Sequence, residues 1–250
     1  MTVHVALLSD VHANLHALDA VLADIASRPS VAATYHLGDL VGYQAHPNAV
    51  IARLAERGIA GVSGNYDSTV AHRYKHCGCR ADTPEQEALA HESFAWTLAT
   101  VTEASRAALA ALPFRLALKP LGGHVSGPTL HLMHATPMNN LVYVTEDRTD
   151  DFLRKMGEQV AAHSGDVVAF GHTHKPWQRF VDGVLYVNTG SVGRPKDGDP
   201  RAGWTLLSIS EQGVSAVQQR VGYDVEGACA AITAAGLPEA FAETLRTGRS

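Results

Sequence analysis

Two histidines, His172 and His174, follow a short apolar run over residues 167–170 that ends at Gly171. The run is typical of a buried strand, and residues two apart in an extended segment point to the same side. We therefore expect both imidazoles to face one spot, and imidazole is the commonest metal ligand among side chains. A His-x-His pair alone is weak evidence for a metal, so the rest of the chain must supply partners.

Similar donors stand at the ends of other predicted strands. Asp10 and His12 follow residues 3–8, Asp39 follows 33–37, Asn65 follows 59–62, and His134 follows 129–133. Taken singly, the aspartates can be helix caps, the asparagine a turn residue and the histidine a core residue. Together, seven nitrogen and oxygen donors at strand ends predict a metal site. They are too many for one tetrahedral ion and suit two ions that share a carboxylate.

The elements that must position these donors alternate between strand and helix over residues 1–62, which predicts an α/β fold with adjacent strands. Residues 68–82 are polar and less regular, and helices are predicted over about 83–98 and 103–112. No linker or repeat divides the chain. We predict a single domain over residues 1–250, with residues 68–127 a candidate for a helical cap-like insertion over the site.

Composition narrows the class of protein. The 250 residues are 46% hydrophobic and 18% charged, with a formal net charge of −5, as in ordinary soluble globular proteins. The negative charge and the lack of a basic run argue against nucleic acid or membrane partners. No apolar stretch has the length of a membrane span and no leader pattern is present, so we expect a cytoplasmic protein. The oligomeric state stays open.

The order of the motifs resembles that of the calcineurin-like metallophosphoesterase superfamily, in its small prokaryotic phosphodiesterase-type branch. The matching motifs span about the first 210 residues and read Asp10-Val11-His12, Gly38-Asp39, Gly64-Asn65-Tyr66-Asp67, His134 and Gly171-His172-Thr173-His174. The resemblance implies a four-layer α/β/β/α sandwich with mixed sheets. It assigns Asp10, His12 and His174 to one metal and Asn65, His134 and His172 to the other, with Asp39 as the bridge.

The chemistry that this ligand set implies follows from charge. Two divalent ions bring four positive charges and two aspartates cancel two, which leaves a surplus of about +2 that attracts phosphate. Such a pair can bridge a hydroxide that attacks phosphorus, so no covalent nucleophile is required. Manganese or iron is the first expectation, and zinc, nickel or cobalt also accepts these donors.

The chain departs from the superfamily pattern where a histidine usually follows Gly-Asn. Tyr66 stands there, and it either packs over the site or acts as a poorer acid than imidazole. Without that imidazole we expect a preference for good leaving groups. His46 is a candidate substitute acid near the substrate, and the simpler interpretation is a helix-cap or surface histidine. The predicted catalytic set is Asp39, Asn65, His134, Tyr66, Asp67 and His46.

Three further side chains carry alternatives. Arg194 can clamp a phosphate beside Asn65 and His46, although an exposed loop arginine is the simpler expectation. Cys77 and Cys79 can form a redox or metal pair, but reduced loop thiols are expected.

The sequence thus predicts a phosphodiesterase for small organic or nucleotide substrates. The alternatives are a dinucleoside polyphosphate hydrolase, a phosphomonoesterase, or a non-catalytic metal-binding interaction module on the same scaffold. The Asp-Arg pair of protein serine/threonine phosphatases is missing after Gly38-Asp39, which argues against a phosphoprotein substrate.

Overall fold

The computed structural model describes residues 2–81, 83–121 and 127–249. The strands are β1 (Thr2–Leu8), β2 (Val31–His36), β3 (Ala60–Gly61), β4 (Arg115–Leu118), β5 (Leu130–Met133), β6 (Val167–Phe170), β7 (Trp177–Val181), β8 (Val184–Asn188), β9 (Ala202–Ser210) and β10 (Gly213–Val221). The helices are α1 (Leu15–Ala26), α2 (Pro47–Glu56), α3 (Asn65–Ala71), α4 (Pro84–Thr100), α5 (Glu103–Ala110), α6 (Asp150–Glu158), α7 (Val225–Ala234) and α8 (Glu239–Thr247).

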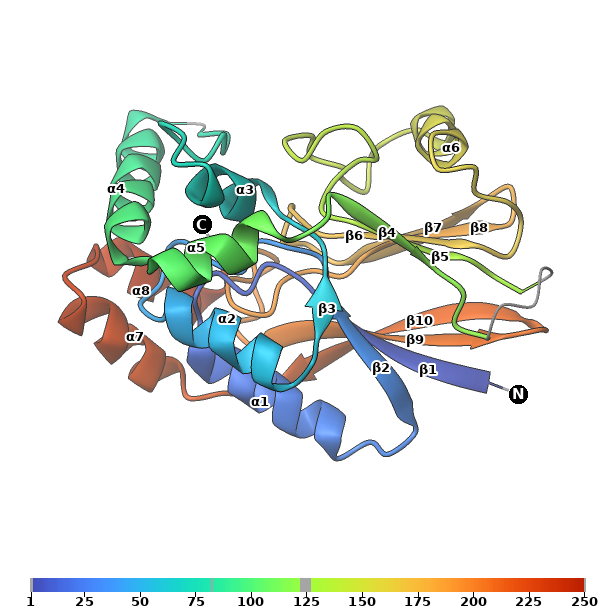
Figure 1. The fold of residues 1–250 in the computed structure, drawn as a ribbon, viewed down its shortest axis with the longest axis horizontal. Coiled ribbons are helices and arrows are strands. Elements are labelled where there is room, and N and C mark those ends of the chain that lie inside the picture. The colour runs from blue at the N-terminus through green and yellow to red at the C-terminus, as the bar shows by residue number, and fades with distance from the viewer. Residues whose placement is uncertain (1, 82, 122–126, 250) are drawn as a thin grey trace.

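Two mixed sheets form the centre of the molecule (Figure 1). The first has the order β10-β9-β1-β2-β3, in which β1, β2 and β3 are parallel and β9 runs antiparallel to β1. The second has the order β4-β5-β6-β8-β7, with β5, β6 and β8 parallel and antiparallel strands at both edges. Strands β1, β2 and β3 alternate with α1 and α2 along the chain, as the sequence pattern predicts.

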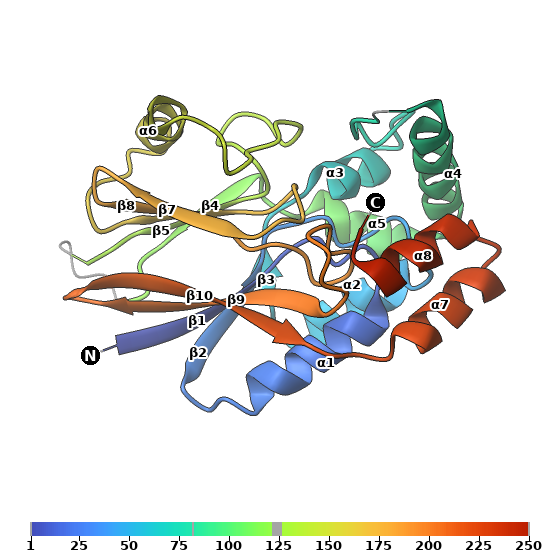
Figure 2. The same ribbon diagram turned by 180° about the vertical axis from the view of Figure 1, so that it is seen from behind.

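Helices cover the outer faces of both sheets. Figures 1 and 2 show α1 and α2 on the outer side of the first sheet, with α7 beside α1, and α6 on the outer side of the second sheet. The result is the predicted four-layer α/β/β/α sandwich with mixed sheets. Helices α3, α4 and α5 lie at the end of the molecule toward which β1 and β2 run (Figure 1). Of the candidate insertion at residues 68–127, residues 82 and 122–126 lie outside the described part of the chain.

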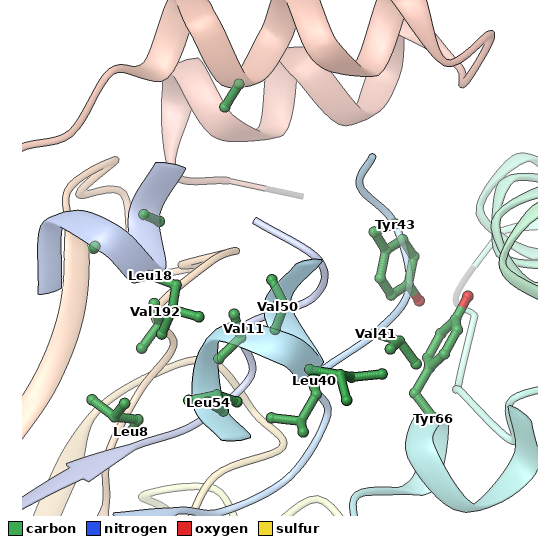
Figure 3. Close-up of a cluster of buried hydrophobic side chains, with 14 of the residues drawn as sticks. Leu8, Val11, Leu18, Leu40, Val41, Tyr43, Val50, Leu54, Tyr66 and Val192 are labelled. Atoms are coloured by element: carbon green, nitrogen blue, oxygen red, sulfur yellow. The ribbon is translucent and has the colours of Figure 1, made fainter. Parts of the chain in front are cut away.

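The pleat of β1 explains how the layers hold together. Val5 and Leu7 are buried between the two sheets, whereas Ala6 and Leu8 on the alternate side are buried against the helices. Figure 3 shows the core between the first sheet and its helices, which contains Leu8 of β1, Leu18 of α1, and Val50 and Leu54 of α2. The second half of β1, residues 5–8, is apolar and buried on both faces, so it holds the residues after its carboxyl end in place.

The polar segment after the third strand is more regular than expected at its start. Helix α3 covers Asn65–Ala71, so residues 68–71 are helical rather than irregular. The carboxylate of Asp67 accepts a hydrogen bond from the backbone N–H of Gly64 at 3.0 Å, which caps this short helix. The cap places Asn65 at the first helical position, beside the ends of the strands.

Candidate metal centre

All seven predicted ligands come together at the carboxyl ends of the parallel strands. They follow β1, β2, β5 and β6 or begin α3, and every one is buried: Asp10, His12, Asp39, Asn65, His134, His172 and His174. Segments far apart in the sequence therefore converge on one place. In α/β folds this edge of the sheet is where ligands bind.

The first group consists of Asp10, His12 and His174. The Nε2 atoms of the two histidines are 3.1 Å apart, and Oδ1 of Asp10 lies 3.3 Å from Nε2 of His174 and 3.8 Å from Nε2 of His12. Ligands held about 2.0–2.2 Å from one ion are themselves about 3–3.6 Å apart. Two of the three separations fall in this range and the third, between Asp10 and His12, is slightly longer, so the three side chains can surround a single ion.

The second group lies beside the first and contains Asn65, His134 and His172. Nε2 of His134 is 3.1 Å from Oδ1 of Asn65 and 3.1 Å from Nδ1 of His172. Together with Asp39, the two histidines form a second buried cluster that can hold an ion. The group matches the ligands that the resemblance assigns to the second metal.

Asp39 lies between the two groups. Its Oδ2 atom is 3.8 Å from Nε2 of His12 in the first group and 3.4 Å from Nε2 of His134 in the second. Its other oxygen, Oδ1, accepts a hydrogen bond from the backbone N–H of Tyr66 at 2.8 Å. One oxygen is thus fixed by the backbone and the other faces both groups, which is the geometry that a bridging carboxylate needs.

Backbone carbonyl groups fix the tautomers of three histidines. Nδ1 of His12 lies 3.0 Å from the carbonyl oxygen of Val41, and Nδ1 of His174 lies 2.6 Å from that of Arg194. Since a carbonyl oxygen only accepts hydrogen bonds, each Nδ1 carries the proton and each Nε2 presents a lone pair. Nδ1 of His134 likewise lies 2.8 Å from the carbonyl oxygen of Leu37, so Nε2 is the nitrogen that faces the site.

The first group of ligands directs several lone pairs at one point, which is the arrangement that a cation requires. The Nε2 atoms of His12 and His174 are both acceptors, so their 3.1 Å contact is repulsive until a positive charge lies between them. Oδ1 of Asp10 is buried without a hydrogen-bond partner among the described residues. Buried acceptors that point at one another need a metal ion or a proton, and nitrogen and oxygen donors of this kind suit divalent transition metals.

The ligand backbone is not extended, contrary to our expectation from the His-x-His spacing. His172 and His174 have φ angles of 66° and 61°, in the left-handed region, and they enter different groups rather than facing one spot. Asp10, His12 and Asp39 are also left-handed, so five of the ten described non-glycine residues with positive φ are candidate ligands. Each such residue costs about 1–3 kcal/mol, and strain of this kind concentrates at functional sites.

Two glycines allow neighbouring ligands to approach the backbone closely. A Cβ atom on Gly64 would lie 2.0 Å from Oδ1 of Asp39, and one on Gly171 would lie 1.9 Å from Oγ of Ser9 and 2.5 Å from Oδ2 of Asp10. Only glycine fits at these positions. Gly64 therefore leaves room for the carboxylate of Asp39, and Gly171 leaves room for that of Asp10.

Burial and charge shift the pKa values of the ligands. Burial lowers the pKa of both His12 and His172 to about 3, aided by a neighbouring imidazole in each case, so both stay neutral. Burial is the largest single influence on His134 and lowers its pKa, but the charge and hydrogen bond of Asp39, together with Asp10 and the carbonyl group of Leu37, outweigh it and raise the pKa of His134 to about 9. In the metal-free chain a proton on His134 thus balances Asp39, and a bound cation would displace that proton.

The remaining predicted catalytic residues around Asn65 have other contacts. Tyr66 is buried, its hydroxyl bonds to Oγ of Ser93 at 2.7 Å, and its ring packs near Tyr43 (Figure 3). Burial and the neighbouring Tyr43 raise its pKa well above 10. Both oxygens of Asp67 accept backbone hydrogen bonds, from Leu40 and Gly64. These contacts give Tyr66 a packing role and Asp67 a role in holding the ligand loops.

His46 and Arg194 lie in different surroundings. His46 occupies the N-cap position of α2 without a side-chain cap hydrogen bond, and its ring neighbours that of His16, with centroids 5.9 Å apart. Arg194 is only 8% exposed and its guanidinium lies 4.0 Å from the ring centroid of Tyr43. The expectation of an exposed loop arginine is therefore wrong, because the loop after β8 folds inward against His174.

The expectation of reduced loop thiols is also wrong in this structure. Cys77 and Cys79 are joined by a disulfide, with their Cα atoms 5.3 Å apart. Gly78 between them has a φ of +74°, which allows the tight turn that brings the sulfur atoms together. This turn contacts the site, since the side-chain amide of Asn65 donates to the carbonyl oxygen of Cys77.

Sequence reasoning missed two residues at the site. The ring of Tyr143 packs against His172, with centroids 4.2 Å apart. Burial and the charge of Arg194 lower the pKa of Lys196 to about 7, and its charge also interacts with Asp10. Neither residue stands in a motif with a ligand, so only the folded chain reveals them.

The layered fold and the two joined groups define a candidate dinuclear site for divalent metals. Residues 3–212 match the calcineurin-like phosphoesterase superfamily domain, and the chain belongs to this superfamily. It is accordingly a phosphoesterase, a hydrolase of phosphoric esters.

Individual relatives cover nearly the whole chain. The chain is 28% identical over 267 aligned positions to an uncharacterized protein of Methanocaldococcus jannaschii, with 98% of each sequence covered. A metallophosphoesterase from Sphaerobacter thermophilus has 25% identity and a TM-score of 0.76, covering 99% of this chain and 100% of its own. A hypothetical protein from Pyrococcus horikoshii has a similar fold, with a TM-score of 0.81, 21% identity and the same coverage. Within the described residues no helix has the length and apolar character to cross a membrane.

Proposed function

We propose that this phosphoesterase is a dinuclear metal-dependent phosphodiesterase that acts on small organic or nucleotide phosphodiesters. The observation that carries the proposal is the position of Asp39, whose Oδ2 lies 3.8 Å from His12 and 3.4 Å from His134. A single carboxylate oxygen shared by two buried groups of acceptors has no use in a mononuclear site.

The residues divide the work of binding two ions. Asp10, His12 and His174 would hold one, Asn65, His134 and His172 the other, and Asp39 both. Two divalent ions, manganese or iron first and zinc, nickel or cobalt as alternatives, would supply Lewis acidity and lower the pKa of a bound water. The chain provides only two carboxylates to four positive charges, so the site keeps a surplus of about +2 that attracts an anionic phosphodiester.

The preference for diesters rests on Tyr66, which stands where the superfamily has an acid. Its hydroxyl is buried and bonded to Ser93, and its raised pKa makes it a poor proton donor at neutral pH. With no proton supplied from this position, substrates with good leaving groups react best. Phosphodiesters of acidic alcohols and nucleotide phosphates meet that requirement better than alkyl monoesters.

A substrate panel tests the proposal. The metal-free protein is loaded with manganese and assayed on cyclic nucleotides, linear diesters, monoesters and dinucleoside polyphosphates. We expect the highest kcat/KM on linear diesters or nucleotide diesters. A higher kcat/KM on monoesters or on dinucleoside polyphosphates would replace the proposal with one of those activities.

A second experiment examines the leaving group itself. The dependence of kcat on leaving-group pKa is measured for the wild type and for Tyr66→His. We expect a shallower dependence in the variant, because an imidazole at this position can protonate the departing oxygen. Identical slopes would refute the argument from Tyr66. Binding of less than about one metal per chain, without ester hydrolysis, would favour a non-catalytic interaction module instead.

The proposal includes a small-molecule substrate in the cytoplasm, without nucleic acid or membrane partners. The net charge of −5 supports this choice, since it provides no general attraction to polyanions.

A further inference from the structure

A cavity of about 730 Å³ lies next to the second group of ligands. Its walls come from α3, the loop at residues 72–78, the end of α5 with Phe114, and the loop that carries Asn140 and Leu141. Volumes of about 300–1,000 Å³ are usual for sites that hold small ligands. Of the residues that line it, only Asn65 belongs to the site predicted from the sequence.

The walls of the cavity are unusually apolar for a surface. Six large hydrophobic side chains are exposed among the described residues, and three of them line this one cavity. They are Tyr74, Phe114 and Leu141, at 57%, 40% and 45% exposure. Leu109 and Leu112 extend the apolar lining. Exposed apolar side chains gathered in a hollow indicate a ligand with an apolar or aromatic face.

The cavity adjoins the candidate metal centre at one residue, Asn65. Asn65 lines the cavity, and its Oδ1 lies 3.1 Å from Nε2 of His134. A phosphoryl group held at the second group of ligands would therefore have the cavity beside it. One ester substituent of the substrate can then extend into the apolar space.

Polar groups in the walls of the cavity indicate which functional groups the ester substituent carries. Asn140 donates from Nδ2 to the carbonyl oxygen of Ser63 at 2.8 Å, whereas its Oδ1 is buried and has no hydrogen-bond partner among the described residues. The loop adds cationic and imidazole side chains from His72, Lys75 and His76. An aromatic group that carries N–H donors and an anionic phosphate fits such a wall.

We propose that this cavity holds the nucleobase and sugar of a nucleotide substrate, with the base against Tyr74 and Phe114 and the phosphate at the metal centre. The proposal rests on the proposed function for the position of the phosphate. A flat aromatic base covers exposed aromatic and leucine side chains, and stacking of this kind tolerates any base.

Calorimetry with two matched ligands tests the cavity without turnover. Adenosine 5′-monophosphate and ribose 5-phosphate share the phosphate and the sugar, and only the first has a base. For the manganese-loaded wild type we expect the nucleotide to bind about tenfold tighter. In Phe114→Ala and Tyr74→Ala this preference should fall below about threefold, while the affinity for ribose 5-phosphate stays within about twofold.

Phe180→Ala is the matched control, because Phe180 is 57% exposed and lies in β7, away from the walls of this cavity. It should keep the wild-type preference. Tyr74 is equally exposed, so its truncation leaves the core intact and a loss of preference reports on the ligand.

Two outcomes separate this inference from the proposed function. Equal affinity of the wild type for both ligands, or a preference that survives in both variants, overturns the cavity proposal even if diesters are hydrolysed. A preference that depends on Phe114 and Tyr74 supports the cavity even if no ester is hydrolysed, and in that case the proposed function alone fails.

Discussion

The side-chain nitrogen of Asn65 lies 3.0 Å from the carbonyl oxygen of Cys77 and donates a hydrogen bond to it. The bond decides which end of the amide faces the site, because it leaves Oδ1 directed at Nε2 of His134. Cys77 is in turn joined to Cys79 across Gly78. The orientation of a candidate metal ligand thus depends on a short disulfide-closed turn.

Opening this turn should weaken binding at the second group of ligands. We expect the double variant Cys77→Ser, Cys79→Ser to bind one of its two manganese ions about tenfold less tightly, since groups that orient a ligand are typically worth 10–100-fold in metal affinity. Manganese titration followed by calorimetry measures the change. Cys229→Ala, which alters the buried free cysteine, should leave both affinities unchanged. Equal affinities in the double variant and the wild type would contradict the dependence.

The bridging position of Asp39 predicts a loss larger than that of any single ligand. In Asp39→Asn the oxygen between His12 and His134 loses its charge, so both groups lose attraction for a cation. We expect less than about one metal per chain after dialysis and a fall in kcat of at least about 10³-fold. Asp10→Asn should instead retain one metal. Metal analysis of both variants decides, and two metals in Asp39→Asn would exclude a bridge.

Tyr66 should matter for stability more than for catalysis. Tyr66→Phe removes the hydrogen bond to Ser93 and keeps the ring that packs against Phe94. We expect a loss of about 1 kcal/mol in the free energy of unfolding, because Ser93 still accepts a hydrogen bond from the backbone of Tyr43. Urea unfolding gives the stability, and kcat on a p-nitrophenyl diester should change less than about threefold. A hundredfold fall in kcat at unchanged stability would instead make the hydroxyl a proton donor.

The positions of the ligands could be predicted from the sequence because each ligand follows an apolar run that is typical of a buried strand. The short loops after β1, β2 and β6 leave little freedom in where Asp10, Asp39 and His172 lie. The backbone conformation of these residues could not be predicted. Periodicity describes extended and helical segments, and it carries no signal for the left-handed angles that direct His172 and His174 into different groups.

Contacts between distant segments explain the other places where the structure differs from what the sequence predicted. Arg194 is buried because its carbonyl oxygen holds His174 and its guanidinium covers Tyr43, and neither partner is near it in the sequence. The start of α3 had a local signal in the sequence, because Asp67 stands three residues after Gly64 and its carboxylate caps the helix. Since Asp67 also belongs to the Gly-Asn motif, the sequence predicted a catalytic role for it. Local patterns thus indicated the fold and the ligands, whereas the supporting residues depend on tertiary packing.

His36, at the end of β2, gives a prediction for the effect of pH on stability. Burial lowers the pKa of this 2% exposed imidazole to about 4, and the unfolded chain has the ordinary value of about 6.5. Because the folded state disfavours the charged form, the stability contributed by neutral His36 is present above pH 6.5 and is lost as the pH falls toward 4. The full loss is about 3 kcal/mol.

Urea unfolding of the metal-free protein at pH 7.5 and pH 4.5 measures this loss against His36→Gln, which cannot be protonated. We expect the variant to lose about 2–3 kcal/mol less than the wild type between these two pH values. The other buried histidines are common to both proteins and cancel in the comparison. His91→Gln, on the exposed side of α4, should follow the wild type. An equal loss in wild type and His36→Gln would show that the imidazole of His36 is protonated as easily in the folded state as in the unfolded one.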